Sequence, residues 1–155
     1  MSQTNFVVDK EKLEVRISRE FKASPERLWK AFSDPKEIAQ WWNNTDIETH
    51  DFRVGGKWRF VEKDPEEAGN EHAFRGEFKE IDEPRKIVRT FEYEPWAGHI
   101  LIETVEIKPQ GEGKTLVTTT SKYDNLQDLE GMVQSGMERG ATAGFERIAK
   151  LVEEN

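Results

Sequence analysis

The sequence contains no cysteine, and this absence excludes several kinds of chemistry at once. A chain without thiols has no disulfide framework, no cysteine nucleophile and no thiolate metal site. Hydrophobic residues make up only 35% of the 155 residues, and no run approaches the roughly 20 apolar residues that span a bilayer. We therefore expect no membrane insertion. Because the first residues lack the apolar stretch of a secretory signal, we expect a cytoplasmic protein.

Positive charge is also in deficit. The chain has 23 Lys and Arg against 31 Asp and Glu, which gives a net charge of −8. A surface that binds nucleic acid or an anionic membrane needs a basic patch, so neither partner is expected. Charged residues make up 35% of the chain, above the typical share of about 25%, and we interpret this charge as a solubilising surface.

The sequence lacks the familiar catalytic motifs. It has no G-x-S-x-G elbow, H-E-x-x-H helix, Walker loop or dinucleotide fingerprint. Its three histidines, His50, His72 and His99, are far apart on separate predicted strands or turns, so neither a metal site nor a cofactor is expected. Glu103, near Arg89 or His99, is the candidate for proton transfer, together with His99 itself. Nothing in the sequence requires that role, and no catalytic residue is assigned.

The apolar periodicity defines the order of the elements. An alternating run from Leu13 to Phe21, interrupted at Arg19, predicts a half-buried strand. The segments "SPERLWKAF" and "DPKEIAQWW" each begin with a capping residue and a proline, which predicts two short helices in tandem. Period-two segments from Thr45 onward predict about six further strands, and their short turns make them antiparallel neighbours. Residues 126–154 have apolar positions three or four apart and predict one long helix.

These elements predict an α+β fold of the helix-grip type. In this fold a curved antiparallel sheet of about seven strands surrounds the long C-terminal helix, and the two short helices follow the first strand. The chain is short enough for a single domain, with a core over about residues 13–153 and residues 1–10 as a loose N-terminal extension. A domain of this length can enclose a sizeable core or an internal pocket.

Several segments, in order, carry a resemblance to a known superfamily. These are "ISREFKASPERLWKAFSDPKEIAQWW", "DFRVGGKWRF", "RGEFKEIDEPRKIVRTFEYE" and "GMERGATAGFERIAKLVEE". Together they resemble the START-like (SRPBCC) superfamily and, within it, the bacterial stand-alone form of the group named after the activator of heat-shock protein 90 ATPase. The resemblance implies a cavity between the long helix and the concave sheet, roofed by the two short helices and the loop after them. It does not fix the function, because this scaffold hosts carriers, cyclases, resistance proteins and co-chaperones.

The C-terminal helix has a feature that fits such a cavity. Gly136, Gly140 and Gly144 form a ridge at four-residue spacing, although each glycine inside a helix costs about 1 kcal/mol relative to alanine. The helix either packs closely against a strand at these positions or is an unremarkable weak helix; alternatively, the wall is left bare so that a guest molecule has room. The sequence leaves these readings open.

Polar residues interrupt the predicted inward faces of several strands. Arg19 lies on the first strand, Arg89 and Glu103 lie between apolar residues of later strands, and Thr118 and Thr120 follow Leu116. Polar groups inside a grip need partners, which can be one another, water or the head group of a ligand. An internal Arg–Glu pair is the simpler explanation for any single residue, whereas the whole set favours a partly wet pocket.

Trp41 and Trp42 are adjacent, so they point about 100° apart on a helix and cannot share one narrow core seam. We expect Ile38 and Trp41 to pack the second short helix onto the core and Trp42 to face the pocket. The opposite assignment, or two rings that serve only as core, remains an alternative.

The leading hypothesis is a carrier or sensor of a small hydrophobic or amphipathic ligand, of lipid, polyketide or aromatic type. The alternatives are a cyclase or hydrolase that uses the same cavity, and a co-chaperone that stimulates the heat-shock protein 90 ATPase. The candidate ligand-binding residues are those predicted to face the cavity: Trp42, Trp58, Phe60, Phe74, Phe78, Arg89, Phe91, Glu103, Thr118, Thr120, Met137, Gly140 and Phe145.

Overall fold

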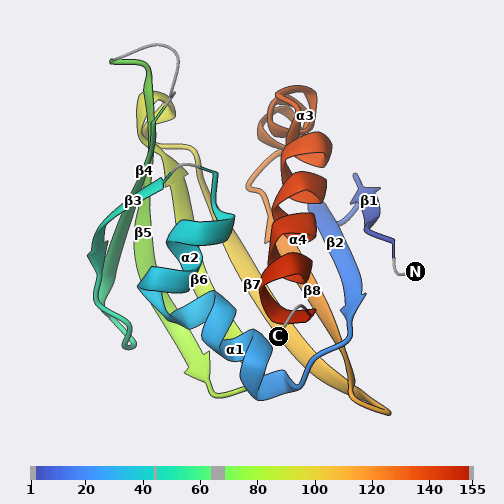
Figure 1. The fold of residues 1–155 in the computed structure, drawn as a ribbon. Coiled ribbons are helices and arrows are strands. Elements are labelled where there is room, and N and C mark those ends of the chain that lie inside the picture. Colours follow the sequence, from blue (N-terminus) through green and yellow to red (C-terminus); the bar gives the residue numbers. More distant parts are fainter. Residues whose placement is uncertain (1–2, 44, 64–68, 154–155) are drawn as a thin grey trace.

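The structure is a computed structural model that describes residues 3–43, 45–63 and 69–153. These residues form an eight-stranded antiparallel sheet with the strand order β1-β2-β8-β7-β6-β5-β4-β3 (Figure 1). The strands are β1 (Asn5–Asp9), β2 (Glu14–Phe21), β3 (Thr45–His50), β4 (Lys57–Lys63), β5 (Glu71–Asp82), β6 (Lys86–Tyr93), β7 (Ile100–Gly111) and β8 (Lys114–Lys122). The helices are α1 (Pro25–Ser33), α2 (Pro35–Trp41), α3 (Leu126–Gln134) and α4 (Met137–Glu153), with a short 3-10 helix η1 (Glu94–Trp96).

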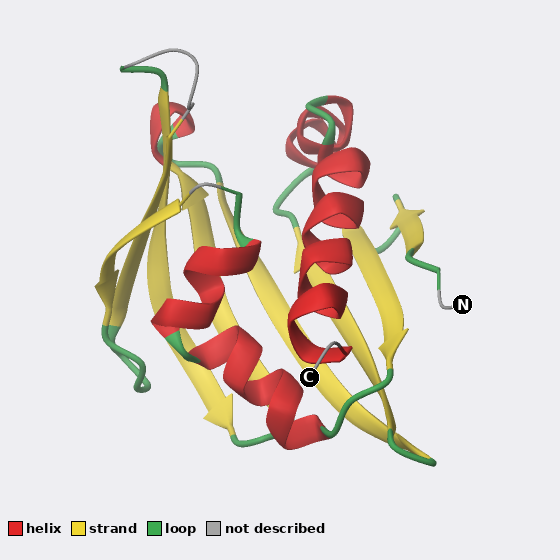
Figure 2. Cartoon of the chain, viewed as in Figure 1, coloured by secondary structure: helices red, strands yellow, loops and turns green. Residues whose placement is uncertain are grey.

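The helices α1, α2 and α4 lie on one face of the curved sheet, and α3 lies just beyond the start of α4 (Figures 1 and 2). The core fills the space between these two layers. Its fully buried side chains include Phe21 of β2, Leu28 of α1 and Ile148 of α4. The rings of Phe21 and Phe145 meet edge to face with centroids 5.9 Å apart, which joins β2 to α4. The predicted α+β helix-grip fold is therefore confirmed.

The two short helices begin where the sequence predicts. The Ser24 hydroxyl accepts a hydrogen bond from the backbone N–H of Arg27 at 3.1 Å, and the Asp34 carboxylate accepts one from Lys36 N–H at 2.9 Å. Each cap precedes a proline at the first helical position, where the missing N–H costs nothing. Asp34 ends α1 and starts α2, so the chain turns sharply and both helices face the sheet.

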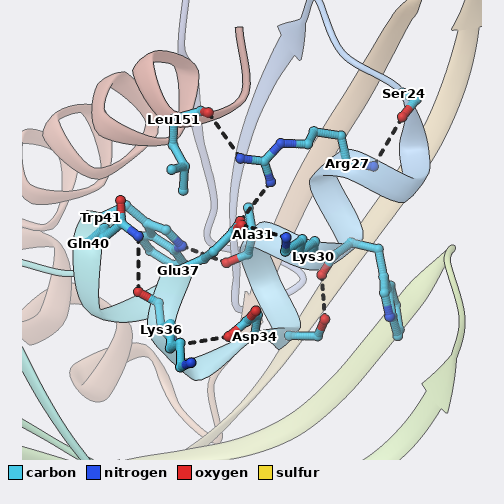
Figure 3. A network of polar contacts seen from close by, with 12 residues as sticks. Ser24, Arg27, Lys30, Ala31, Asp34, Lys36, Glu37, Gln40, Trp41 and Leu151 are labelled. Atoms are coloured by element: carbon cyan, nitrogen blue, oxygen red, sulfur yellow. Dashed lines mark hydrogen bonds and ion pairs between the residues drawn. The ribbon is translucent and has the colours of Figure 1, made fainter. Parts of the chain in front are cut away.

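A network of polar contacts fixes this helix pair to the end of α4 (Figure 3). The guanidinium of Arg27 donates to the Glu37 carboxylate at 2.7 Å and to the backbone carbonyl of Leu151 at 3.1 Å. The indole N–H of Trp41 donates to the Ala31 carbonyl at 2.7 Å. These bonds join α1, α2 and α4, so the roof over this part of the sheet has a fixed position.

The C-terminal helical segment is broken, and the prediction of one long helix is wrong. α3 ends at Gln134 and α4 begins at Met137, with Gly136 between them at a φ of 94°. This left-handed conformation is accessible to glycine at little cost and ends the first helix. The apolar spacing continues across the break because residues of both helices, such as Leu129 of α3 and Ile148 of α4, pack into the same hydrophobic core. Periodicity alone therefore does not reveal the break.

The segment predicted as a loose N-terminal extension contains a strand. β1 pairs antiparallel with β2, from Asn5 opposite Ser18 to Asp9 opposite Glu14. Phe6 and Val8 of this strand pack against the core. The expectation of a loose extension is therefore wrong for residues 5–9, and β1 is the eighth strand of a sheet predicted to have about seven.

The register of β8 also differs from the expectation. Its buried residues are Thr115, Val117, Thr119 and Ser121, so Thr118 and Thr120 lie on the opposite face of the sheet. A shift of one residue moves every side chain of a strand to the other face. Threonines occupy both faces of β8, and Leu116 on the outer face imitates an inward residue, so the alternation gives no clear choice. β2 follows the predicted pattern, with Val15, Ile17, Arg19 and Phe21 buried.

A cavity between the sheet and the helices

A cavity with two lobes, open to solvent, lies between the concave face of the sheet and the helices. The larger lobe, about 830 Å³, is bounded on the helical side by η1 and α3, and the smaller lobe, about 370 Å³, by α2 and α4. Both lobes are lined by Glu62, Phe74, Phe91, Glu103, Ser121 and Met137, so they adjoin. We call these shared residues the junction. Each lobe alone has a volume in the range of typical small-molecule sites, which measure about 300–1,000 Å³.

The three glycines of the predicted ridge have different surroundings. A Cβ atom built on Gly140 would meet no heavy atom within 4 Å, and Gly140 lines the smaller lobe. A Cβ on Gly144 would lie 4.0 Å from the ring of Trp41, which is ordinary contact. Gly136 belongs to the helix break. Close packing at the Gly140 position is absent within the described part of the chain, and Gly140 is exposed, which is consistent with the bare wall and with a weak helix.

Trp41, the last residue of α2, and Trp42, which follows it, both line the smaller lobe. The Trp42 ring lies among aromatic side chains of the sheet, with centroids 5.0 Å from Phe60 and 5.8 Å from Phe74. Its N–H donates to the Glu62 carboxylate at 2.9 Å. The Trp41 ring packs against Phe32 at 5.4 Å. Trp42 therefore faces the pocket as expected, while Trp41 combines packing with a place in the wall.

An ion pair crosses the floor of the smaller lobe. The Arg89 guanidinium of β6 donates to the Glu103 carboxylate of β7 at 2.8 Å, across directly paired strand positions. The guanidinium also lies 4.4 Å from the ring centroid of Trp58, so an aromatic face and a carboxylate both stabilise its charge. Arg19, the other predicted inward arginine, pairs instead with Glu146 of α4 at 2.7 Å.

The junction holds a second carboxylate that the sequence analysis did not select. Glu62 follows Trp58 and Phe60 at period two on β4, so continuing the alternation by one step would have found it. Its carboxylate accepts the Trp42 N–H and forms no ion pair among the residues that the structure describes. The two carboxylates of the junction thus differ, because Glu103 has a cationic partner and Glu62 has none.

The larger lobe contains polar and aromatic groups that periodicity did not select. His72 of β5 lies opposite Glu62 on the paired strand, and its Nδ1 is 2.6 Å from the Tyr93 hydroxyl. The Tyr123 hydroxyl lies 3.6 Å from the sulfur of Met137. Burial raises the pKa of Tyr123 well above its usual value, so this phenol is neutral. The lobe therefore presents hydroxyl, imidazole and thioether groups beside its rings.

The η1 segment and α3 meet at the edge of the larger lobe. The ring of Trp96 lies against Gly131, where an added Cβ would come within 3.2 Å of the indole. His99 Nδ1 is 2.8 Å from the Asp128 carboxylate, which ties the loop after η1 to α3. Trp96 is 37% exposed and Leu126 is 44% exposed, so apolar surface faces solvent here.

The predicted ligand-binding residues fall into three groups. Those that line one or both lobes are Trp42, Phe74, Arg89, Phe91, Glu103, Met137, Gly140 and Phe145. Trp58, Phe60 and Phe78 are almost fully buried and form the core beneath the lobes, which they do not line. Thr118 and Thr120 are on the wrong face, and their neighbours Thr119 and Ser121 line the cavity instead.

Within residues 3–43, 45–63 and 69–153, no group of three or more potential metal ligands is gathered. His50 lies on β3, where its Nε2 is 2.7 Å from the carbonyl of Ser33, and burial lowers its pKa. His99, one of the two candidates for proton transfer, lines neither lobe. The other candidate, Glu103, is held by Arg89.

A curved antiparallel sheet that grips a C-terminal helix over an internal cavity defines a START-like domain. Within that class, the sequence matches the family described as Activator of Hsp90 ATPase homolog 1-like protein over residues 22–153. The chain belongs to this family. No curated protein matches the sequence significantly.

Solved structures agree with this assignment. A protein from Arthrobacter aurescens is 27% identical, with a TM-score of 0.87 over 97% of this chain and 92% of the other. Protein Ms6760 from Mycobacterium smegmatis is 22% identical, with a TM-score of 0.85 over 96% of this chain and 95% of the other, which shows the shared fold. PFC0360w, an HSP90 activator from Plasmodium falciparum, is 25% identical, with a TM-score of 0.63 over 82% of this chain and 89% of the other. In the described part of this chain, no helix is long and apolar enough to cross a membrane.

Proposed function

We propose that this protein binds a small hydrophobic or amphipathic molecule, of lipid, polyketide or aromatic type, in the cavity, as a carrier or sensor. The observation that supports this most strongly is the open space beside Gly140, an exposed residue in the first turn of α4 that lines the smaller lobe. A helix interior gains about 1 kcal/mol when glycine is replaced by alanine, and no neighbour would obstruct that alanine. A glycine that packing does not require is consistent with a wall shaped for a guest molecule.

The chemistry of the lining supports an amphipathic ligand. Apolar groups of the smaller lobe include Ile17, Phe32, Val105 and Phe145, which suit a hydrocarbon or ring system. Hydroxyl groups and carboxylates lie at the junction and in the larger lobe, and Arg89 and Arg147 line the smaller lobe, so both lobes offer polar partners. A ligand with one apolar and one polar end would find partners for both ends along the cavity.

The geometry supports binding over turnover. A cyclase or hydrolase would need a general acid or base that is free to exchange a proton with a substrate. Glu103 is engaged in an ion pair with Arg89, and removing a partner from such a pair leaves an uncompensated charge. We therefore assign Glu103 to charge pairing. Glu103→Gln should reduce stability or ligand affinity without abolishing a chemical step.

A second candidate function is stimulation of the Hsp90 ATPase. It is favoured by the family description and by the likeness to the Plasmodium falciparum activator. An assay of ATP hydrolysis by a purified Hsp90, with and without this protein, tests it directly. Stimulation that persists in Gly140→Leu would separate this role from the cavity, whereas no stimulation at any ratio would remove the candidate.

Native mass spectrometry of freshly purified protein tests the proposed function. We expect a population heavier than the bare chain, and extraction with organic solvent should release a small molecule. Gly140→Leu is the control, because a leucine at this position would occupy the smaller lobe and reduce the retained fraction. If only the bare chain is seen and no member of a lipid and polyphenol panel binds, the proposal is wrong.

A further inference from the structure

We propose that the cavity selects ligands that carry a positively charged amine, with Glu62 as the counter-ion. This inference rests on the proposed function and specifies its ligand class. It starts from the junction, where the two lobes meet. The junction contains two carboxylates, two phenyl rings, one hydroxyl and one thioether, and neither lysine nor arginine: Glu62, Glu103, Phe74, Phe91, Ser121 and Met137.

The charged groups of the lining are distributed unequally between the two lobes. Arg89 lines the smaller lobe and neutralises Glu103, with which it shares a 2.7 Å contact. Arg147 also lines the smaller lobe, where its guanidinium points to the carbonyl of Trp41 at 3.4 Å. No lysine or arginine of the described chain lines the larger lobe, whereas the smaller lobe has two arginines against the same two carboxylates. Among the described residues, Glu62 forms no ion pair, and its one hydrogen bond comes from Trp42.

The hydrogen bonding of Glu62 leaves it ready for a cation. Oxygen Oε2 accepts the Trp42 N–H, and no hydrogen bond to Oε1 is formed within the part of the chain that the structure describes. An anionic carboxylate that is partly withdrawn from water gains most from a hydrogen-bonded cation. A carboxylate or phosphate on the ligand would be repelled at the same place. His72, which lies opposite Glu62, is directed to the Tyr93 hydroxyl through Nδ1.

The aromatic rings of the lining would also attract a cation. Phe74, Phe91 and Tyr93 line the larger lobe beside Glu62, and Trp96 lies at its edge. Aromatic faces attract ammonium groups through the ring quadrupole, and this attraction strengthens when the cation is desolvated. The net charge of −8 would also raise the rate at which a cationic ligand meets the protein.

The inference is tested with three probes that share one skeleton: 4-phenylbutylamine, 4-phenylbutanol and 4-phenylbutyrate. Binding to the full chain is measured by tryptophan fluorescence and by amide shifts in NMR spectra. We expect the amine to bind at least about tenfold more tightly than the alcohol, which corresponds to about 1.4 kcal/mol, and the acid to bind most weakly. Intermolecular NOEs should join the methylene next to the amine to the rings of Phe74 or Tyr93.

Glu62→Gln should remove the preference for the amine over the alcohol, so that the ratio of the two affinities falls to about one. Glu11→Gln is the matched control, because it removes the same charge from an exposed turn residue that lines neither lobe. It should leave the preference intact. If Glu62→Gln does not fold, the order of the three probes on the unmodified protein still decides the matter.

Two results would overturn this inference but not the proposed function. One is an alcohol or acid that binds as tightly as the amine. The other is an amine preference that survives Glu62→Gln or falls equally in Glu11→Gln. If none of the three probes binds, and the lipid and polyphenol panel also fails, both this inference and the proposed function are wrong.

Discussion

The α1–α2 side of the cavity and its α3–η1 side differ in how they are held. On the first side, Arg27 joins α1 to Glu37 of α2 and to the last turn of α4, and Leu28 is fully buried. On the second side, two contacts join η1 and the loop after it to α3: His99 with Asp128, and the Trp96 ring with Gly131. Both segments also expose apolar surface. Local opening is expected where buried apolar contacts are few. The comparison indicates that the α1–α2 side contributes more to the stability of the fold, and the α3–η1 side is where we would expect the proposed ligand to enter.

The largest difference in unfolding free energy is expected when one leucine on each side is truncated. Leu28→Ala on α1 removes a side chain with 0% exposure and should destabilise the protein by about 2–5 kcal/mol. Leu126→Ala on α3 removes one that is 44% exposed, and its cost should be much smaller. Urea denaturation of both variants measures the difference. Equal losses of unfolding free energy would show that the two sides contribute alike.

Removal of the Arg27 guanidinium should give the next largest effect. Arg27→Met leaves the Glu37 carboxylate, whose side chain is 10% exposed, without its closest partner and frees the Leu151 carbonyl. A buried polar group without a partner costs about 1–3 kcal/mol. Arg53→Met is the control, since its Asp51 pair is exposed, and it should change stability little. Thermal unfolding that is unchanged in Arg27→Met would contradict a structural role for the network.

Substitutions on α4 separate the cavity wall from the packed part of the helix. Gly140→Leu should weaken probe binding by about tenfold or more while leaving the melting temperature unchanged or higher, because its side chain enters the smaller lobe. Gly140→Ala should bind normally and be more stable. Gly144→Leu should be destabilised, because its side chain would press on Trp41. A large fall in the melting temperature of Gly140→Leu would instead show tight helix–sheet contact.

The pH dependence of stability gives the smallest expected effect. Burial lowers the pKa of His50, whose Nε2 faces the Ser33 carbonyl of α1 and whose Nδ1 is buried without a partner in the described chain. Below the ordinary histidine value of about 6.5, the unfolded chain binds the proton more readily than the folded one. The unfolding free energy should therefore decrease as the pH falls from about 6.5 toward the pKa of the folded state.

His50→Gln provides the comparison, because the other titrating groups remain in both proteins. Urea midpoints measured at several pH values should fall more steeply for the unmodified protein than for His50→Gln. Parallel pH profiles would show that His50 does not contribute to the acid sensitivity of the α1 side.

Local sequence signals were sufficient where a single physical effect decides the structure. The caps at Ser24 and Asp34 predicted both short helices, because proline and a capping oxygen act within one turn. The alternation in β2 predicted its buried face, including Arg19, because its apolar residues fall on one side. At Gly140 the sequence left several readings open, because it does not show what lies beside this position, and the structure excludes close packing among the described residues.

Other features depend on tertiary structure. The sequence of β8 does not reveal which of its faces is buried, because threonine is accepted on either side of a strand. The break at Gly136 requires a positive φ that the apolar spacing does not reveal. His72 and Tyr93 come together only because β5 and β6 are paired neighbours. Glu62 is different, because the alternation of β4 continues one step past Phe60 and predicts that Glu62 faces inward.

The most direct test of the central claim is an NMR titration of the protein with 4-phenylbutylamine. The account predicts that amide signals of Gly131, Met137 and Gly140 and the indole signal of Trp42 shift and saturate, while Glu11 and other residues remote from both lobes do not move. Saturation below about 1 mM would correspond to a binding free energy stronger than about −4 kcal/mol. Shifts confined to the outer face of the sheet, or no shifts at all for this probe and for the lipid and polyphenol panel, would contradict the claim that the cavity is a ligand site.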